Sequence, residues 1–227
     1  MPSITLPEII DRLQKLYGKP KPPLADPWLL ILWENVAYLA NDRRRQQAFD
    51  LLRKEVGTEP ERILNASEQT LQKIGSHGIV PKQSVAKLQT CARIALDEFD
   101  GELGPVLRMP VRDAKKALMK FPGIGEPGAE KILLFCRSHS LFGLESNGLR
   151  VLRRLGYGVD HKNYATMYRS VRDAVARELK PDLGWRIRAH QLLRQHGQET
   201  CKQTPRCQEC PLANDCPDYQ SRLGGGA

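Results

Sequence analysis

The 227-residue sequence lacks long apolar runs, a secretory signal and the alternating pattern of β-strands. No apolar stretch approaches the roughly 20 residues that a membrane helix needs, which argues against a membrane protein. The first ten residues, MPSITLPEII, have neither the basic nor the apolar region of a secretory signal. We therefore expect a soluble, intracellular protein of the cytoplasm with no membrane partner.

Apolar residues recur instead at helical spacing along most of the chain. The predicted fold class is all-α, and a chain of this length can form one large domain or two small domains that share a cleft. The tail, residues 221–227, is expected to be disordered. Helices are predicted over residues 6–18, 26–42, 43–57, 67–75, 82–101, 110–121, 146–156, 164–180 and 184–197.

The charge balance is strongly basic. Lys and Arg number 35 against 26 Asp and Glu, and the sequence pI is near 9.4. This excess favours a polyanionic partner, nucleic acid before membrane. A basic protein with no such partner would show the same excess, so charge alone leaves both interpretations open.

Four of the six cysteines crowd into one segment, CKQTPRCQECPLANDC, with the spacing C-x5-C-x2-C-x5-C. In a chain without a secretory signal, such crowding indicates a metal site before disulfides. A structural zinc site usually pairs two separated C-x2-C units, whereas one compact loop can wrap around a [4Fe-4S] cluster. We favour the cluster, with zinc and disulfides as alternatives, and the ligands would be Cys201, Cys207, Cys210 and Cys216. Cys91 and Cys136 are predicted to be small core residues.

A second motif is the stretch FPGIGEPGAEKILLF, residues 121–135, where a tight turn leads into an apolar helix. Gly123 and Gly125 can adopt conformations closed to other residues. Their amides and the start of the next helix would then point outward together and attract a phosphate, directly or through a cation. Pro127 suits the first helical turn, where its missing N–H costs nothing. The alternative is a helix–helix turn whose glycines serve packing alone.

The two motifs together resemble the endonuclease III and MutY superfamily of DNA glycosylases. LMKFPGIGEPGAEKILLF is similar to its helix-hairpin-helix, and CKQTPRCQECPLANDC is similar to its C-terminal iron–sulfur loop, although the first cysteine gap is one residue shorter than usual. The resemblance runs from about Asp26 to Cys216. It implies a six-helix barrel over residues 26–137, a cluster domain formed by residues 1–25 and 138–220, and an active site in the cleft between them. Double-stranded DNA would cross the hairpin, with the target base flipped out.

The catalytic carboxylate that the resemblance implies is Glu145, in GLESNGLRV. The family has an aspartate at this position, where a carboxylate stabilises the developing sugar cation and directs water. Glutamate keeps the charge but moves it outward by one methylene, and a shift of roughly 1 Å can cost about 10²-fold in rate. Either the pocket is reshaped for Glu145 or catalysis is lost. The alternative role is a carboxylate that favours a helix N-terminus.

Two further positions bear on the chemistry. Bifunctional relatives carry a nucleophilic lysine where this chain has Pro127, so strand cleavage by a Schiff base should be absent. Lys131, one turn later, is expected to be solvated or to face a phosphate. Glu34 interrupts an apolar helix at the position where MutY-like glycosylases carry a glutamate that protonates or orients the base. Its alternative is a buried structural glutamate paired with an arginine.

Other DNA contacts are expected from an apolar wedge, an aromatic side chain and several basic groups. Leu39 is the predicted wedge, and Tyr38 would either stack on a base or join the core. His77 belongs to a loop that faces DNA in the family. The basic candidates are Lys120, Arg43, Arg44, Arg45, Lys202 and Arg206.

The sequence therefore predicts a monofunctional DNA glycosylase of base excision repair, a monomer associated with the nucleoid. The chain shows no extra C-terminal region of the kind that MutY uses to read 8-oxoguanine. The alternative function is a catalytically degenerate helix-hairpin-helix protein that binds DNA without releasing a base. A third reading, a bifunctional glycosylase and lyase, would need Lys131 or another amine as nucleophile.

Overall fold

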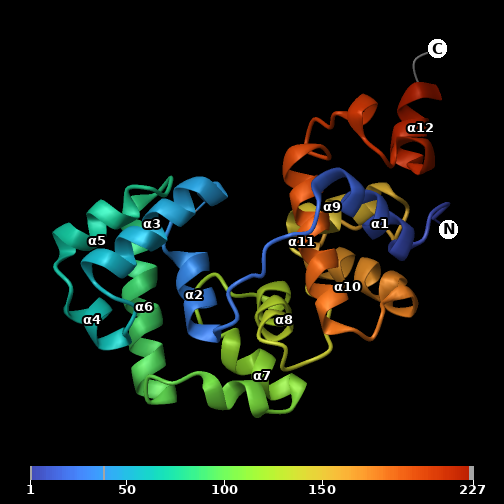
Figure 1. The fold of residues 1–227 in the computed structure, drawn as a ribbon. Helices are drawn as coiled ribbons and strands as arrows, with labels where there is room; N and C mark the ends of the chain where they lie inside the picture. The colour runs from blue at the N-terminus through green and yellow to red at the C-terminus, as the bar shows by residue number, and fades with distance from the viewer. Residues whose placement is uncertain (1, 38, 225–227) are drawn as a thin grey trace. The chain divides into compact units, whose positions relative to one another are not determined.

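The computed structural model describes residues 2–37 and 39–224 of the chain. Every regular element in these two ranges is helical, with twelve α-helices and four short 3-10 helices (Figure 1). The predicted all-α fold class is confirmed. Among the same residues, no helix is long and apolar enough to cross a membrane.

The chain divides into two compact units, one of residues 23–139 and one of residues 1–22 and 140–227. We call them the hairpin unit and the cysteine unit. The hairpin unit contains α2 (Pro27–Asn35), α3 (Asp42–Glu55), α4 (Pro60–Asn65), α5 (Glu68–Gly75), α6 (Pro81–Phe99), α7 (Val111–Leu118) and α8 (Glu126–Phe135). The cysteine unit contains α1 (Leu6–Tyr17), α9 (Ser146–Arg154), α10 (Tyr164–Val175), α11 (Leu183–Glu199) and α12 (Pro217–Gly224).

In the hairpin unit, α6 is the long central helix, and α4 and α5 pack along it (Figure 1). Helix α2 is buried almost all round, as its apolar sequence predicts, with Leu30, Ile31 and Leu32 at most 3% exposed. It begins at Asp26, whose carboxylate accepts a hydrogen bond from the backbone N–H of Leu29 at 2.8 Å. It ends at Asn35, seven residues before the predicted end at residue 42.

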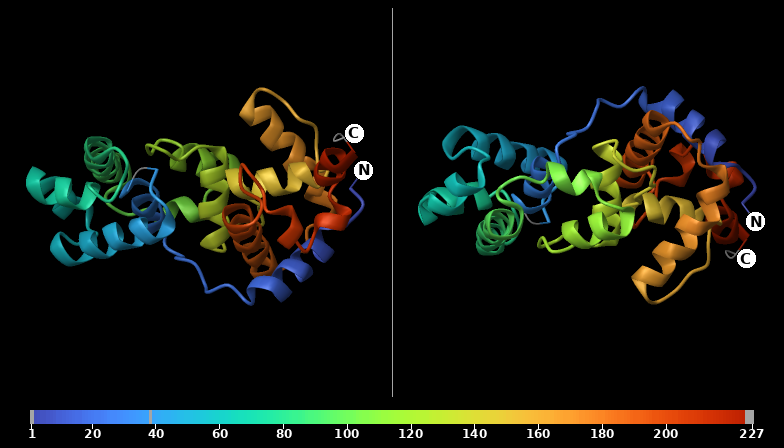
Figure 2. Two further views of the ribbon diagram at one scale, coloured as in Figure 1. Left: turned by 90° about the horizontal axis from the view of Figure 1, so that it is seen from above. Right: turned by 90° about the horizontal axis from the view of Figure 1, so that it is seen from below.

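In the cysteine unit, α11 packs between α1 and α9, so that the N-terminal helix completes a core built by the C-terminal half (Figure 2). Leu6, Ile9 and Leu13 of α1 are fully buried in the same cluster as Leu192 and Leu193 of α11. The apolar period of α1 therefore predicts which face of this helix is buried. The helix that covers this face, α11, lies some 180 residues away in sequence and is known only from the fold.

Two helices were not predicted. Helix α4 begins at Pro60, which suits a first helical turn. Helix α12 carries Pro217 at its start and extends to Gly224, so residues 221–224 of the tail expected to be disordered are helical. An ion pair between Asp218 and Arg222, one turn apart, stabilises this helix.

Gly197 of α11 marks the closest approach between α11 and α9. A Cβ atom added there would lie 2.5 Å from the backbone oxygen of Asn147. We expect Gly197→Ala to lower the free energy of unfolding by about 1–3 kcal/mol, because the helices must separate to admit the methyl group.

Urea unfolding followed by circular dichroism measures this change. Gly104→Ala is the control, because a Cβ atom added at Gly104 meets nothing within 4 Å. Equal stability of the two variants would contradict the close packing of α9 on α11.

Candidate functional site

The hairpin turn connects α7 to α8 and presents its backbone to solvent. Helix α8 begins at Glu126 with Gly125 as its N-cap residue, as predicted. Gly123 has φ of +76°, a left-handed conformation that favours glycine. Both glycines are exposed, and neither backbone N–H donates a hydrogen bond to any described residue. Two unpaired amides beside a helix N-terminus form a site that can bind an anion.

A buried ion cluster holds the two hairpin helices together. The ammonium group of Lys115 on α7 lies 2.6 Å from Glu126 and 2.7 Å from Glu130, both on α8. Glu130 is only 2% exposed, so its charge needs a partner. Burial acts to lower the pKa of Lys115, but the hydrogen bonds and charges of the two glutamates outweigh it and raise the pKa. The turn that presents Gly123 and Gly125 is thus anchored by three charges.

A second ion cluster joins α2 and α8. Lys131 donates a hydrogen bond to the carboxylate of Glu34, and a guanidinium nitrogen of Arg45 lies 3.8 Å from the same carboxylate. The side chains of Lys131 and Arg45 are 13% and 14% exposed. Lys131 is therefore not solvated, contrary to the expectation from the sequence. Glu34 is paired with an arginine, which was the alternative role considered for that residue. With two cationic groups directed at it, the Glu34 carboxylate is placed as a hydrogen-bond acceptor.

Asn35 lies beside Glu34 and faces the hairpin turn. Its side-chain amide donates to the backbone oxygen of Ile31 at 3.0 Å, and the residue is 1% exposed. Its amide oxygen has no hydrogen-bond partner among the described residues, and it lies 3.3 Å from where a Cβ atom of Gly123 would be. Any side chain at Gly123 would therefore press against Asn35, which explains the glycine by close approach as well as by φ.

Leu39 stands out among the other predicted DNA contacts of the hairpin unit. It is 59% exposed and has φ of +59°, a conformation that is rare for a branched apolar residue and that concentrates at functional positions. Tyr38 lies outside the described residues. Ile79, at 63% exposure, is an apolar residue that the sequence analysis missed. The neighbouring residues His77 and Gly78 indicated a loop at this point of the sequence. They did not indicate that the side chain of Ile79 would be exposed there.

Three basic candidates of the hairpin unit, Lys120, Arg43 and Arg44, are exposed, and they lie in different environments. Lys120 pairs with Glu98 and stands over the ring of Phe99. Arg43 is exposed, and Arg44 donates to the backbone oxygen of Ser76 at 3.2 Å, next to His77. A phosphate would have to compete with Glu98 for Lys120, whereas Arg43 makes no ion pair with a described residue.

Glu145, in the cysteine unit, is the N-cap residue of α9. Its carboxylate accepts hydrogen bonds from the backbone N–H groups of Asn147 at 2.9 Å and Gly148 at 2.8 Å, and from the side-chain amide of Asn147 at 2.8 Å. This is the helix N-terminal role anticipated as its alternative, and it also fixes the carboxylate in one orientation. The side chain remains partly exposed, so a cap and a reactive carboxylate are compatible here.

Glu145 is connected to the cysteine loop through two side chains. Arg150 donates to the amide oxygen of Asn147 at 2.7 Å, and it also donates to the backbone oxygens of Gly197 at 2.7 Å and Cys201 at 2.9 Å. The chain of contacts therefore runs from the carboxylate through Asn147 and Arg150 to the first cysteine of the loop.

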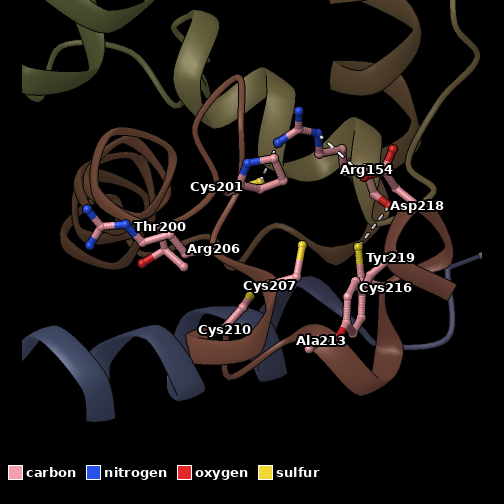
Figure 3. Close-up of a pocket in the computed structure, with 11 residues that line it drawn as sticks. Arg154, Thr200, Cys201, Arg206, Cys207, Cys210, Ala213, Cys216, Asp218 and Tyr219 are labelled. Atoms are coloured by element: carbon pink, nitrogen blue, oxygen red, sulfur yellow. Dashed lines mark hydrogen bonds and ion pairs between the residues drawn. The ribbon is translucent and has the colours of Figure 1, made fainter. Parts of the chain in front are cut away.

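All four cysteines of the loop line one pocket, and the sulfur atoms of Cys207 and Cys216 point into it (Figure 3). Arg154 lies across the pocket and donates to the thiol of Cys201 at 3.3 Å. Burial raises the pKa of Cys210 to about 11 and also raises the pKa of Cys216. Buried thiols without a metal are thus held in the protonated form, which a bound metal would reverse.

His196 connects this pocket to α1. One ring nitrogen lies 3.4 Å from the sulfur of Cys210, and the other lies 3.0 Å from the hydroxyl of Tyr17. Burial lowers the pKa of His196 to about 4, so the ring is neutral at physiological pH. A neutral imidazole has one donor and one acceptor, and it can donate to a cysteine sulfur while it accepts from the tyrosine.

The four thiols give the pocket the donor set of a metal site. A single zinc ion would need its four sulfurs within bonding distance of one point, whereas each thiolate of a cubane binds a different iron. Four thiols around one pocket fit the ligand set of a [4Fe-4S] cluster. Cys91 and Cys136 lie apart from it, and burial raises the pKa of each thiol to about 12.

Comparison with known proteins gives relatives along most of the chain. No family model matches it. The sequence is 24% identical over 201 residues to endonuclease III of Thermotoga maritima, covering 88% of this chain and 87% of the relative. It is 26% identical over 209 residues to endonuclease III of Sulfolobus acidocaldarius, covering 91% and 86%.

Solved structures show the same fold. A trapped covalent endonuclease III–DNA intermediate matches with a TM-score of 0.75 at 18% identity, covering 97% of this chain and 99% of that one. A thermostable thymine-DNA glycosylase matches with a TM-score of 0.71 at 14% identity, covering 95% and 97%.

A substitution of Lys115 tests whether its ion pairs with Glu126 and Glu130 stabilise the hairpin. Lys115→Met removes the ammonium that contacts Glu126 and the buried Glu130, and we expect the free energy of unfolding to fall by about 3–5 kcal/mol. Lys116→Met, at the exposed neighbouring position, is the matched control and should change stability little. Chemical denaturation of both variants makes the comparison, and equal stabilities would contradict the anchoring role.

The stability difference between wild type and Lys115→Met should depend on pH. Because the glutamates raise the pKa of Lys115, its contribution to stability is complete below the ordinary lysine pKa of about 10.4 and is lost as the pH rises through the folded value. The stability difference between wild type and Lys115→Met should therefore narrow only in strongly alkaline solution. A stability difference that narrows between pH 6 and pH 9 would contradict the raised pKa of Lys115.

Proposed function

We propose that this chain, whose sequence relatives and fold support its place in the endonuclease III and MutY-like helix-hairpin-helix superfamily, is a monofunctional DNA glycosylase of base excision repair. It would hydrolyse the N-glycosidic bond of a damaged or mismatched base flipped out of double-stranded DNA. The observation that carries the proposal is Glu145, a partly exposed carboxylate fixed by three hydrogen bonds.

Glu145 has the properties that hydrolysis of this bond requires. Positive charge develops on the sugar as the base departs, and a preorganised carboxylate stabilises that charge without rearranging. The same group can accept a proton from the attacking water. Asn147 and Arg150 act as positioning residues, because Asn147 donates to the Glu145 carboxylate and Arg150 in turn donates to the amide oxygen of Asn147. Glu34 would act at the base.

Two features support a monofunctional reaction. Proline at position 127 has no amine to attack the sugar. The amine of Lys131, one turn further along α8, donates a hydrogen bond to Glu34 and is directed at that carboxylate. Neither residue therefore supports strand cleavage through a Schiff base.

DNA would be bound through the backbone and basic side chains of the hairpin unit. The amides of Gly123 and Gly125 would take a phosphate, Arg43 and Lys120 would add charge, and Leu39 would fill the space left by the flipped base. Most of these contacts are to the phosphate backbone, so binding should weaken steeply with salt.

A base-release assay tests the proposal. The duplexes would carry uracil, thymine opposite guanine, hypoxanthine, thymine glycol, alkylated purines or adenine opposite 8-oxoguanine. Strand cleavage only after hot alkali, with no product trapped by borohydride, is the expected result. Cleavage without alkali would contradict the monofunctional reaction. Intact duplex binding with no base released would favour the degenerate DNA-binding protein.

Glu145→Gln should reduce base release by at least about 10²-fold, because the amide keeps the size of the side chain and removes its charge. Duplex binding should be unchanged. Glu199→Gln, at an exposed position of α11, is the matched control. Single-turnover release rates give the comparison, and full activity in Glu145→Gln would exclude Glu145 as the catalytic carboxylate.

The cysteine pocket would hold a [4Fe-4S] cluster through Cys201, Cys207, Cys210 and Cys216. When bound, the cluster would brace the loop whose first residue contacts Arg150. Protein prepared without oxygen should contain about four iron atoms per chain. Cys210→Ser should lose most of the iron, and Cys91→Ser, in the core of the other unit, should keep it. Zinc in place of iron would contradict the cluster.

A further inference from the structure

The Glu34 and Lys131 pair has an arrangement that a purely structural ion pair does not need. Both Lys131 and Arg45 direct their charges to one carboxylate, and that carboxylate remains 24% exposed. An ammonium has three N–H donors. Glu34 is the one acceptor found for Lys131 within the described part of the chain. The pair therefore offers a ligand a cationic donor and an anionic acceptor side by side.

We propose that Lys131 is a catalytic residue that donates a hydrogen bond to the departing base, and that the substrates are neutral bases that leave as carbonyl-bearing anions. The inference rests on the proposed function, in which the base is held at Glu34. Lys131 belongs to the same residue cluster as Glu34, so a base that reaches the carboxylate also reaches the ammonium.

The electron balance of the reaction gives Lys131 its role. The bond between C1′ and the base nitrogen breaks, and its electron pair stays with the base. Conjugation moves the negative charge onto a carbonyl oxygen, which accepts a hydrogen bond from the Lys131 ammonium. Water bonds to C1′ and loses one proton to solvent, and the base anion takes a proton from solvent. A cationic donor aimed at charge that develops in the transition state is the kind of contact that accelerates a reaction.

Glu34 has a different role in this scheme. It orients Lys131 and accepts a hydrogen bond from an N–H group of the base through a carboxylate oxygen. Its negative charge also offsets one of the two positive charges of Lys131 and Arg45. Arg45 remains a cationic neighbour of the carboxylate if Lys131 turns toward the base.

The charge of the cluster restricts the substrate class. Uracil, thymine and hypoxanthine are neutral, carry a carbonyl oxygen next to an N–H group, and leave as anions. Alkylated purines such as 7-methylguanine and 3-methyladenine carry a positive charge in DNA and leave neutral. Two cations beside one carboxylate repel such bases, and their departure gains nothing from a donor.

The test compares leaving groups. Single-turnover release would be measured for uracil and 5-fluorouracil, and for hypoxanthine and 8-azahypoxanthine, in wild type, Lys131→Met and Lys131→Arg. The second base of each pair is the better leaving group. Lys131→Met should lose about 10²-fold or more on uracil or hypoxanthine and tenfold or less on its partner. Lys131→Arg should recover much of the loss, and Lys116→Met should match wild type.

Each outcome bears on one proposal. Equal losses on both members of a pair would show that Lys131 only supports the structure, and would overturn the inference while the glycosylase stands. Faster release of cationic purines than of neutral bases, or release confined to bases without a carbonyl oxygen, would also overturn it. No release of any base by wild type would reject the proposed function itself. Duplex binding and thermal unfolding of each variant separate misfolding from lost chemistry.

Discussion

A buried charge must be paired, and this constraint shapes every part of the protein that carries candidate chemistry. Glu130 is buried and takes Lys115 as its cation, which fixes the hairpin helices. Glu34 lies in an apolar helix and takes Lys131 and Arg45. Arg154, itself almost buried, donates to carbonyl groups and to a thiol of the cysteine loop. Each pairing fixes a backbone or side chain that would otherwise be mobile.

Charged groups at helix ends and charged groups on helix faces are fixed in different ways. Carboxylates at helix N-termini, such as Glu145, satisfy backbone N–H groups and thereby become rigid. Charged groups on helix faces, such as Lys131, meet partners on neighbouring helices and become oriented. Rigid, oriented charge is what transition-state stabilisation requires, because no energy is then spent on reorganisation during the reaction. Stability and the proposed catalysis therefore draw on the same contacts.

Much of this protein could be predicted from local sequence. The period of apolar residues gave the all-α class and the positions of most helices. Gly123 has the positive φ that the hairpin sequence predicted, whereas Gly125, with φ of −91°, is in an extended conformation open to other residues. The cysteine spacing brought four thiols to one pocket, as expected for a metal site. Short helices such as α4 and α12 escaped prediction because one or two turns carry too few apolar positions to show a period.

The sequence by itself determined which residues carry charge, which backbone positions need glycine, and which helix faces are apolar, since these depend on neighbours one to four residues away. Only the tertiary structure decided the partners. It paired Lys131 with Glu34 across 97 residues and joined Arg150 to Cys201 across 51. Those pairings arise from how the helices pack, because burial removes water from a charged group and favours the arrangement that brings an opposite charge to it.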